Sequence, residues 1–490
     1  MVETGPTAAA RVPRRGRLRL ALSAFVAMVL TAGLLAGAAT GTFSALARSA
    51  LYGVGLYRDG GASTVPPGFF DSPAASSHET PRGPEDPVLE PRPTGRNPRG
   101  SVLADRVGAL SDDGIGRPGF AVADPATGTV LSSADGSTAM IPASALKLLT
   151  GLAALDAYGP EHRFTTTVVS GKPGQVVLVG GGDPYLAKQR RTGAYPSRAS
   201  LDDLADQVAT AVKATKFGSM ITVDWDATLF SGPAWNPTWP AGYADQTTPT
   251  SALWVDEGRK GAGSPGPREA DPARAAASAF TATLKKRGLK VRLGDPAEAA
   301  KGANRVASVR SMPMSQIVEE VLLHSDNDAA EVLFRQVPLA DGKPGSIIEA
   351  RKAVERRLTA LGAWSDNAVV HDGSGLSRDD RVTPQTFLTV LELALSSKHP
   401  ELRALVTGLP VAGTDGSLRY RFFVDGTQAG RGDVHAKTGT LRGVHALVGY
   451  ATTADGALVA IAFVVNGATN DYNARNWLDR AASVVAGCGC

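Results

Sequence analysis

A change of composition near residue 100 constrains the fold of this 490-residue chain most. Residues 53–100 are dense in proline, glycine and serine, and such a stretch cannot bury enough apolar surface to offset its conformational entropy. We therefore expect a disordered linker over residues 48–100. The globular part is expected to begin near Ser101 and is long enough to build a large core.

The segment before the linker has the features of an export signal. Five arginines lie between residues 11 and 19, and residues 20–47 contain no charged side chain. That run is long enough for a signal peptide or for a membrane-spanning helix of about 20 residues. Ala45 and Ala47 offer a small-x-small cleavage site. We expect residues 1–47 to be a cleaved signal or a retained anchor, with the remainder outside the cytoplasm.

Composition excludes several classes of function. The net charge is only +4, and the N-terminal arginines account for the excess, so we expect no nucleic-acid partner. The two cysteines, Cys488 and Cys490, exclude a disulfide framework in the core and a cysteine-rich zinc site. We expect no metal and no cofactor. The two cysteines could pair locally or between molecules, but we favour an exposed tail without a role.

The globular part begins and ends with similar elements. Its start predicts a helix, a hairpin and a second helix at residues 102–110, 120–132 and 143–157. Its end predicts a hairpin at residues 444–465 and a helix at 473–485. We expect an α/β (α+β) fold in which both chain ends build one antiparallel sheet, with a helical block between them.

The middle of the chain is predicted to be an insertion into that domain. Residues 165–307 mix strands with helices, whereas residues 314–396 are mainly helical. We assign residues 101–186 and 308–490 to the main domain. Residues 187–307 are assigned to an inserted mixed α/β subdomain.

Ser144 and Lys147 form the chain's one S-x-x-K match, at the start of the predicted helix 143–157. Residues three apart on a helix share a face, about 5–6 Å apart at Cβ. A serine hydroxyl needs a base to remove its proton, and a buried lysine of lowered pKa can do so. We predict a nucleophile and its base, although a simple helix cap is the alternative for Ser144 alone.

Two Ser-Asp-Asn triplets compete for a second motif that would deliver a proton to a leaving group. Ser325 and Asn327 lie at a junction between two apolar helices, where a rigid frame suits catalysis. Residues 365–367 lie between a helix end and a strand, which is typical of a turn. We choose Ser325 and Asn327.

Lys437, Thr438 and Gly439 form a third motif, with Thr440 next to it, just before the predicted hairpin 444–465. We expect these residues on an edge strand of the sheet. A lysine and a hydroxyl together can hold a carboxylate. The glycine lets another backbone approach closely.

The order S-x-x-K, S-x-N, K-T-G is the signature of penicillin-binding proteins and serine β-lactamases. From Ser101 onward the chain resembles the low-molecular-mass class C penicillin-binding proteins, the DacB-type D-alanyl-D-alanine carboxypeptidases and endopeptidases. Similar segments are residues 180–186, 324–331, 372–378 and 409–418. We interpret the glycine-rich loops as ordinary turns and assign them no catalytic role.

The resemblance implies a β-lactamase/transpeptidase-like fold and a serine-type peptidase that acts on peptidoglycan peptides ending in D-Ala-D-Ala. It implies inhibition by β-lactams. The N-terminal arginines, the uncharged run and the linker add the expected location, secreted to the cell wall or anchored to the plasma membrane, with membrane contact through the N-terminal segment if that segment is retained.

The resemblance also implies residue roles. Ser144 would form the acyl-ester and Lys147 would accept its proton. Ser325 would relay a proton to the departing D-alanine. The remaining motif residues would contact the substrate. Asn327 would hold a substrate amide, and Lys437 and Thr438 would bind the carboxylate. Gly439 would let the substrate backbone approach closely, and the N–H groups of Ser144 and Thr440 would bind the oxyanion.

Two departures from the class stand out. The stretch between Ser144 and Ser325 is short for this class, which points to an insertion that is reduced or missing. Residues 239–246 match only loosely, so no residue is assigned to recognition of the stem-peptide side chain.

Two alternative functions remain open. A serine β-lactamase is one; no Glu-x-x-x-Asn motif of the class A enzymes lies between the first two motifs, and a class C enzyme would have tyrosine in place of Ser325. The other is a non-catalytic scaffold that binds the wall. The complete set of nucleophile, base and relay argues against a scaffold.

Overall fold

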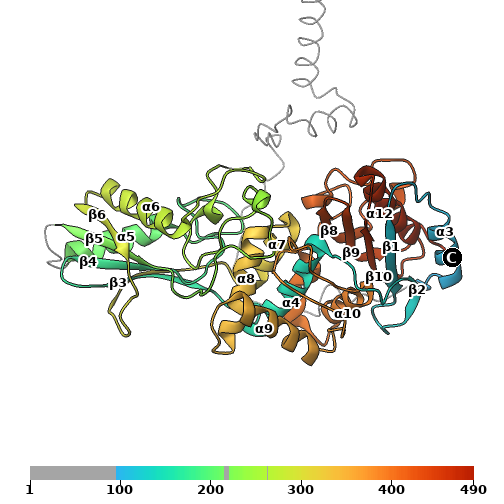
Figure 1. Ribbon diagram of the computed structural model, residues 1–490, viewed down its shortest axis with the longest axis horizontal. Helices are drawn as coiled ribbons and strands as arrows, with labels where there is room; N and C mark the ends of the chain where they lie inside the picture. Colours follow the sequence, from blue (N-terminus) through green and yellow to red (C-terminus); the bar gives the residue numbers. More distant parts are fainter. Residues whose placement is uncertain (1–94, 215–219, 262) are drawn as a thin grey trace, which may run out of the picture. The chain divides into compact units, whose positions relative to one another are not determined.

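Strands from both ends of the described chain form one antiparallel sheet (Figure 1). The computed structural model describes residues 95–214, 220–261 and 263–490. Across the sheet the order is β2 (Val130–Ala134), β1 (Arg117–Ala123), β10 (Leu458–Asn466), β9 (Val444–Thr452) and β8 (Val434–Leu441). The predicted closure of the fold by both chain ends is confirmed.

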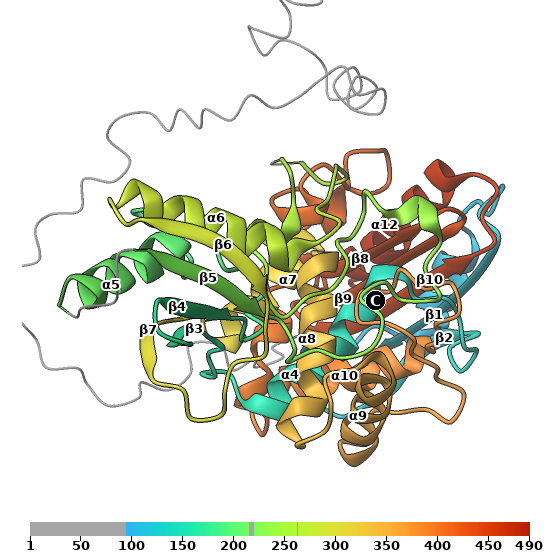
Figure 2. The same ribbon diagram turned by 60° about the vertical axis from the view of Figure 1, so that its left-hand side comes forward.

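The two faces of this sheet enter different cores. On β10, Ala462 and Val464 pack with the helical block, whereas Ile461 and Phe463 pack on the opposite face. Strand alternation explains the division, because successive side chains point to opposite faces. Helices α3 (Gly100–Gly108) and α12 (Asp471–Ala486) cover the second face, while α10 (Pro384–Leu395) lies on the first (Figure 2).

The helical block surrounds α4 (Lys147–Tyr158), which is buried from Lys147 to Leu155. The burial of this helix explains why Lys147, the lysine of the first motif, has no access to water. Other helices of the block are α7 (Met314–His324), α8 (Asn327–Ala340), α9 (Ile347–Ala360) and α11 (Ala404–Thr407).

A second sheet of five strands forms the insertion. Its order is β6 (Val291–Pro296), β5 (Ile221–Asp226), β4 (Gln175–Val179), β3 (Thr165–Ser170) and β7 (Arg305–Arg310). Helices α5 (Leu201–Ala214) and α6 (Pro272–Lys286) pack against it. An insertion is therefore present rather than missing.

The second sheet extends beyond the boundary at residue 187 that the sequence suggested. Strands β3 and β4 precede that residue, and β4 pairs in parallel with β5. The sheet runs from Thr165 to Arg310, close to the limits of the mixed segment 165–307. A strand pattern alone does not reveal which sheet a strand will join.

The C-terminal tail is tied to the body. Cys488 and Cys490 form a disulfide, and Cys488 is 1% exposed in the core beside α12. The carbonyl of Cys490 accepts hydrogen bonds from the backbone N–H and the side chain of Arg99. Our expectation of an exposed tail is wrong, because the segment entering α3 packs on it.

Most of the predicted N-terminal organisation lies outside the described residues. This applies to the signal or anchor at 1–47 and to the linker up to residue 94. The last linker residues are ordered against the body: Asn97 donates to Asp124, and α3 begins at Gly100.

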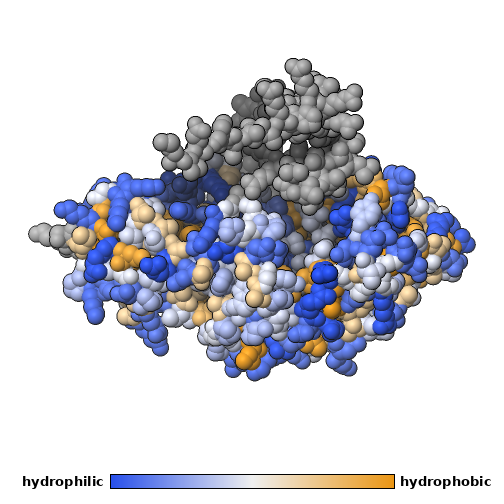
Figure 3. Space-filling view, turned by 45° about the horizontal axis from the view of Figure 1, so that its top comes forward, coloured by the Kyte–Doolittle hydropathy of each residue, from blue (hydrophilic) through white to orange (hydrophobic). Residues whose placement is uncertain are grey.

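One face of the described body shows how its polar and apolar residues are distributed. On the face drawn in Figure 3, hydrophobic residues lie in small groups among hydrophilic ones. Within residues 95–490, apart from the short gaps, no helix is long and apolar enough to span a bilayer.

Helix α9 provides a matched test of this packing. Leu358 is 0% exposed and Ile348 is 65% exposed on the same helix. Leu358→Ala should lower the free energy of unfolding by about 2–5 kcal/mol, because it leaves a cavity. Ile348→Ala should change it by about 0.5 kcal/mol or less. Urea denaturation of both variants measures the difference, and equal losses would contradict the assigned core.

Candidate active site

The first motif lies where a short 3-10 turn, Ala143–Leu146, runs into α4. Ala143 has φ +46°, an unusual value for a residue with a side chain, which marks a locally strained turn. The turn leaves Ser144 partly accessible, while Lys147 is completely buried. Lys147 Nζ donates to Ser144 Oγ over 2.8 Å.

Lys147 Nζ has two further acceptors. They are Asn327 Oδ1 and the backbone carbonyl of Ser374, each at 2.7 Å. Burial lowers the pKa of Lys147 to about 8, opposed by nearby carboxylates, of which Asp372 is the strongest.

These contacts select the direction of proton transfer. A neutral amine has two N–H bonds and one lone pair. Carbonyl oxygens only accept, so the Asn327 and Ser374 oxygens take the two N–H bonds. The lone pair then faces the Ser144 hydroxyl, which can donate its proton to it. The arrangement can therefore activate a serine nucleophile.

The second motif lies at the predicted junction of two helices. Ser325 ends α7 in the left-handed conformation, with φ +55°, and Asp326 caps α8 by accepting from the Ala329 N–H. Asn327 is the first residue of α8, and its Nδ2 donates to the Gln246 carbonyl over 3.2 Å. The tight turn holds Ser325 and Asn327 close to the two motif lysines.

The third motif lies on β8, an edge strand, as predicted. Lys437 is fully buried, and its Nζ donates to Ser325 Oγ over 2.7 Å and to the Thr438 carbonyl over 2.6 Å. Burial lowers the pKa of Lys437 well below its ordinary value, and the nearby Lys147 lowers it further. Ser325 is thereby hydrogen-bonded to an amine that can exchange a proton with it.

The remaining residues of the third motif line the same strand. The hydroxyls of Thr438 and Ser417 are 2.8 Å apart. A Cβ at Gly439 would lie 2.7 Å from the Pro142 carbonyl, so only glycine lets β8 approach the nucleophile turn. Thr440 is exposed and is paired with His445, so its side chain takes no part in this cluster.

The structure thus brings five predicted residues into two hydrogen-bonded groups. One group joins Ser144, Lys147 and Asn327; the other joins Ser325 and Lys437. The competing triplet at residues 365–367 is elsewhere: Asn367 donates to the Ser137 carbonyl. Its interpretation as turn chemistry agrees with the turn that the Ala368 N–H closes by donating to the Ser365 carbonyl over 2.8 Å.

The loop at residues 372–377 was missed as a functional element. Its Ser374 carbonyl binds Lys147, and Glu331 Oε1 accepts from the N–H groups of Gly373 and Ser374 at 2.9 and 2.8 Å. Asp372 accepts from the Gly375 N–H and from the Trp239 indole, each over 2.7 Å. Because a backbone atom makes the key contact, no residue type revealed it; only the glycine-rich resemblance marked the loop.

One group of carboxylates among the described residues is close enough to hold a cation. Oxygens of Glu257, Asp326 and Asp328 lie within 4.8 Å of one another. Arg259 already forms ion pairs with all three. An internal guanidinium thus occupies the position that a metal would take.

Comparisons with known proteins agree with this geometry. The profile of the D-Ala-D-Ala carboxypeptidase 3 (S13) family matches residues 102–262 and 265–486. A carboxypeptidase of Mycobacterium tuberculosis is 33% identical over 401 residues, covering 79% of this chain and 84% of the relative. Carboxypeptidase DacB of Mycolicibacterium smegmatis is 34% identical over 409 residues, covering 82% and 86%.

A solved structure supports the fold. Penicillin-binding protein 4 (dacB) of Haemophilus influenzae superposes with a TM-score of 0.63 at 22% identity, over 77% of this chain and 97% of that one. The same protein has also been solved in complex with a β-lactam. The predicted transpeptidase-like fold is confirmed.

The buried base predicts a pH dependence. Because the pKa of Lys147 is about 8, its neutral, proton-accepting form grows as pH rises through that value. The rate constant for acylation of Ser144 by a fluorescent penicillin should therefore rise with an apparent pKa near 8. Lys147→Arg should remove that limb, and a wild-type rate constant that falls between pH 7 and 9 would contradict the assignment.

Two glycines in the left-handed region test the loop that positions the base. A Cβ at Gly375 (φ +79°) would lie 1.9 Å from the Ala143 carbonyl, whereas one at Gly362 (φ +70°) would meet nothing within 4 Å. Alanine at either position carries strain of about 1–3 kcal/mol. Only Gly375→Ala should also slow the acylation of Ser144. Equal acylation rates in the two variants would refute the contact.

Proposed function

The chain belongs to the D-Ala-D-Ala carboxypeptidase 3 (S13) family, and on that premise we propose that it is a serine-type D-Ala-D-Ala peptidase. Its substrates are peptidoglycan stem peptides, and Ser144 forms the acyl-enzyme. The observation that carries the proposal is the hydrogen bond of Ser144 to a buried Lys147, whose other two acceptors leave the lone pair for the serine proton.

Acylation follows from this geometry. Ser144 Oγ attacks the carbonyl carbon of the penultimate D-alanine, and its proton passes to Lys147. The developing oxyanion is stabilised by backbone N–H groups, for which Ser144 and Thr440 are the candidates. As the tetrahedral adduct collapses, the C–N bond breaks and the leaving amine takes the proton that Lys147 received, relayed through the Ser325 hydroxyl. In deacylation water attacks the ester and gives a proton to Lys147, and this proton returns to Ser144 Oγ when the C–O bond of the ester breaks.

Binding of the substrate falls to the edge of the sheet. Lys437 and Thr438 lie beside Ser325 and suit the terminal carboxylate of the peptide, because a charged donor and a hydroxyl can both bond it. Asn327 can hold a substrate amide through the amide group that also bonds Lys147. Penicillins, which carry a carboxylate and an acylating carbonyl, would react at the same serine.

The proposed site of action is outside the cytoplasm. The arginine-rich start and the uncharged residues 20–47 support export, either by a cleaved signal or with a retained anchor. The linker would let the catalytic body reach the cell wall.

Muropeptide analysis tests the proposal. The full-length chain, incubated with purified peptidoglycan fragments, should release D-alanine from pentapeptides by carboxypeptidase action, or split cross-linked dimers by endopeptidase action. Mass spectrometry separates these products, and Ser144→Ala should form neither. A wild-type protein that leaves both substrates intact would contradict the proposal and favour a wall-binding scaffold.

The lifetime of the penicillin adduct separates the peptidase from a β-lactamase. A peptidase of this type should keep the adduct for hours, because nothing in the described site resembles the deacylating glutamate motif of class A enzymes. Intact-protein mass spectrometry measures its decay. Turnover of penicillin within seconds would identify a β-lactamase.

A further inference from the structure

Alternate residues of the segment 325–328 contact two different parts of the molecule. Ser325 and Asn327 contact the two lysines of the active site. Asp326 and Asp328, the alternate residues, contact Arg259 of the insertion, which ends the short turn Asp256–Gly258. The same four-residue segment thus has one catalytic side and one side held by the inserted subdomain.

Arg259 binds both aspartates of this segment through the Nη2 atom of its guanidinium. Its Nη2 lies 2.8 Å from Asp326 Oδ2 and 3.1 Å from Asp328 Oδ2. Its Nε lies 2.7 Å from Glu257 Oε2. The side chains of Asp326 and Asp328 are 6% and 0% exposed, so water cannot replace the arginine at either carboxylate.

Neighbouring groups complete the cluster formed by Arg259, Glu257, Asp326 and Asp328. Arg268 lies 3.3 Å from Asp328, and the Thr248 N–H donates to Asp328 over 2.7 Å. Arg198 bridges Glu257 and Glu320 on its outer side. Burial raises the pKa of Glu257 to about 9 and that of Asp328 to about 6, because an ionised carboxylate is unfavourable away from water.

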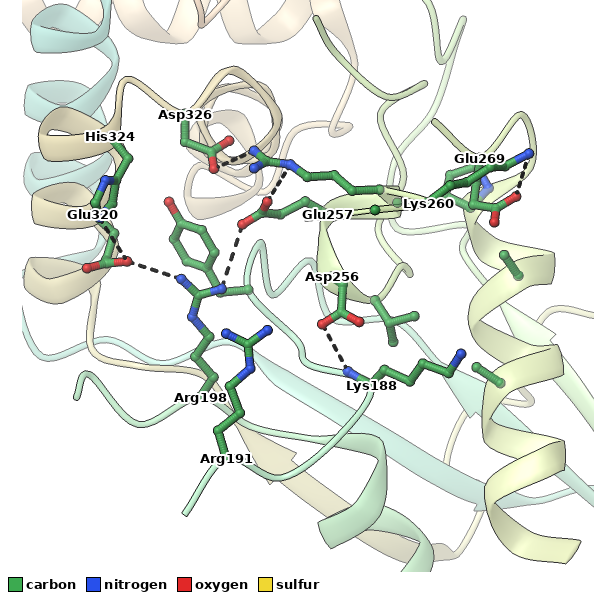
Figure 4. A pocket seen from close by; sticks show the side chains of 18 residues that line it. Lys188, Arg191, Arg198, Asp256, Glu257, Lys260, Glu269, Glu320, His324 and Asp326 are labelled. Atoms are coloured by element: carbon green, nitrogen blue, oxygen red, sulfur yellow. Dashed lines mark hydrogen bonds and ion pairs between the residues drawn. The ribbon is translucent and has the colours of Figure 1, made fainter. Parts of the chain in front are cut away.

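The backbone that presents Arg259 is itself strained. Asp256 and Glu257 both have positive φ, +48° and +59°, and neither is a glycine. Such conformations persist where the surrounding structure enforces them, and they concentrate at functional sites. The cluster borders a cavity of about 640 Å³, where the carboxylates of Glu257 and Asp326 both reach the same guanidinium, that of Arg259 (Figure 4).

We propose that Arg259 is a positioning residue for catalysis: it fixes Asp326 and Asp328 and thereby sets Ser325 and Asn327 against the active-site lysines. This inference rests on the proposed function and extends it to the inserted subdomain. Arg259 touches neither Ser144 nor Lys147 in any contact of the described structure, so it acts through the backbone of the second motif.

Arg259→Met in the full-length chain tests the inference, with Arg287→Met as the matched control. Arg287 also pairs with two carboxylates of the insertion, Asp202 and Asp206, but these lie on α5. We expect Arg259→Met to reduce the acylation rate constant with fluorescent penicillin by about 10²-fold, the loss expected for a small displacement of a catalytic group. The control should react like wild type.

Two readouts distinguish positioning from simple destabilisation. Without Arg259, only Arg268 among the described residues offsets the charge of Asp328, whose pKa of about 6 lies between pH 5 and pH 8, so the defect should be smaller at pH 5 than at pH 8. With a peptide substrate, kcat should fall by a larger factor than KM rises, because Ser325 acts in the reaction step and the carboxylate contacts of Lys437 and Thr438 lie outside the cluster. Arg259→Lys should restore part of the rate, since a single ammonium cannot bridge three carboxylates.

The acylation rate constants of these variants either support or overturn the role of Arg259. A folded Arg259→Met variant that is acylated at the wild-type rate, or a control that loses as much, overturns the inference. If Arg259→Met does not fold, Arg259→Lys decides, and a wild-type rate constant in that variant overturns it. A wild-type chain that forms no adduct overturns the proposed function and this inference together, whereas a reactive wild type isolates the role of Arg259.

Discussion

The burial of Lys147 is the constraint on which the rest of the structure depends. An amine without access to water must be hydrogen-bonded, and here three acceptors from three separate parts of the chain meet it: Ser144, Asn327 and the Ser374 carbonyl. Burial also weakens its hold on a proton and brings its pKa to about 8. One desolvated group therefore fixes the geometry of the site and supplies its base.

Elements from distant parts of the chain bring the hydrogen-bond partners of Lys147 together. The apolar helix α4 places Lys147 in the interior, and α8 brings Asn327 to it. The loop at residues 372–377 supplies the third acceptor, and hydrogen bonds to Glu331 and Asp372 fix that loop. The edge strand β8 brings Lys437 to Ser325, which lies at the end of α7. The inserted subdomain contacts the second motif and its neighbour Asp328 through Gln246, Thr248 and Arg259. The inserted subdomain is therefore part of the architecture of the site.

Much of this could be predicted from the sequence, because spacing and local chemistry carry the information. The three-residue spacing of Ser144 and Lys147 implies a shared helix face, and a polar triplet between two apolar helices implies a rigid turn at Ser325. The carbonyl of Ser374 could not be predicted, since every residue has one and its approach to Lys147 depends on tertiary packing. The same holds for Arg259, for the membership of β3 and β4 in the second sheet, and for the buried Cys488.

The central claim is that Ser144 is the nucleophile and that Lys147 activates it. Peptide mapping of the penicillin-treated protein by tandem mass spectrometry tests this most directly. We expect a penicilloyl group on the Ser144 hydroxyl, and no adduct at that position in a folded Lys147→Ala variant over the same interval. An adduct on another residue, or undiminished labelling of Ser144 without Lys147, would contradict it.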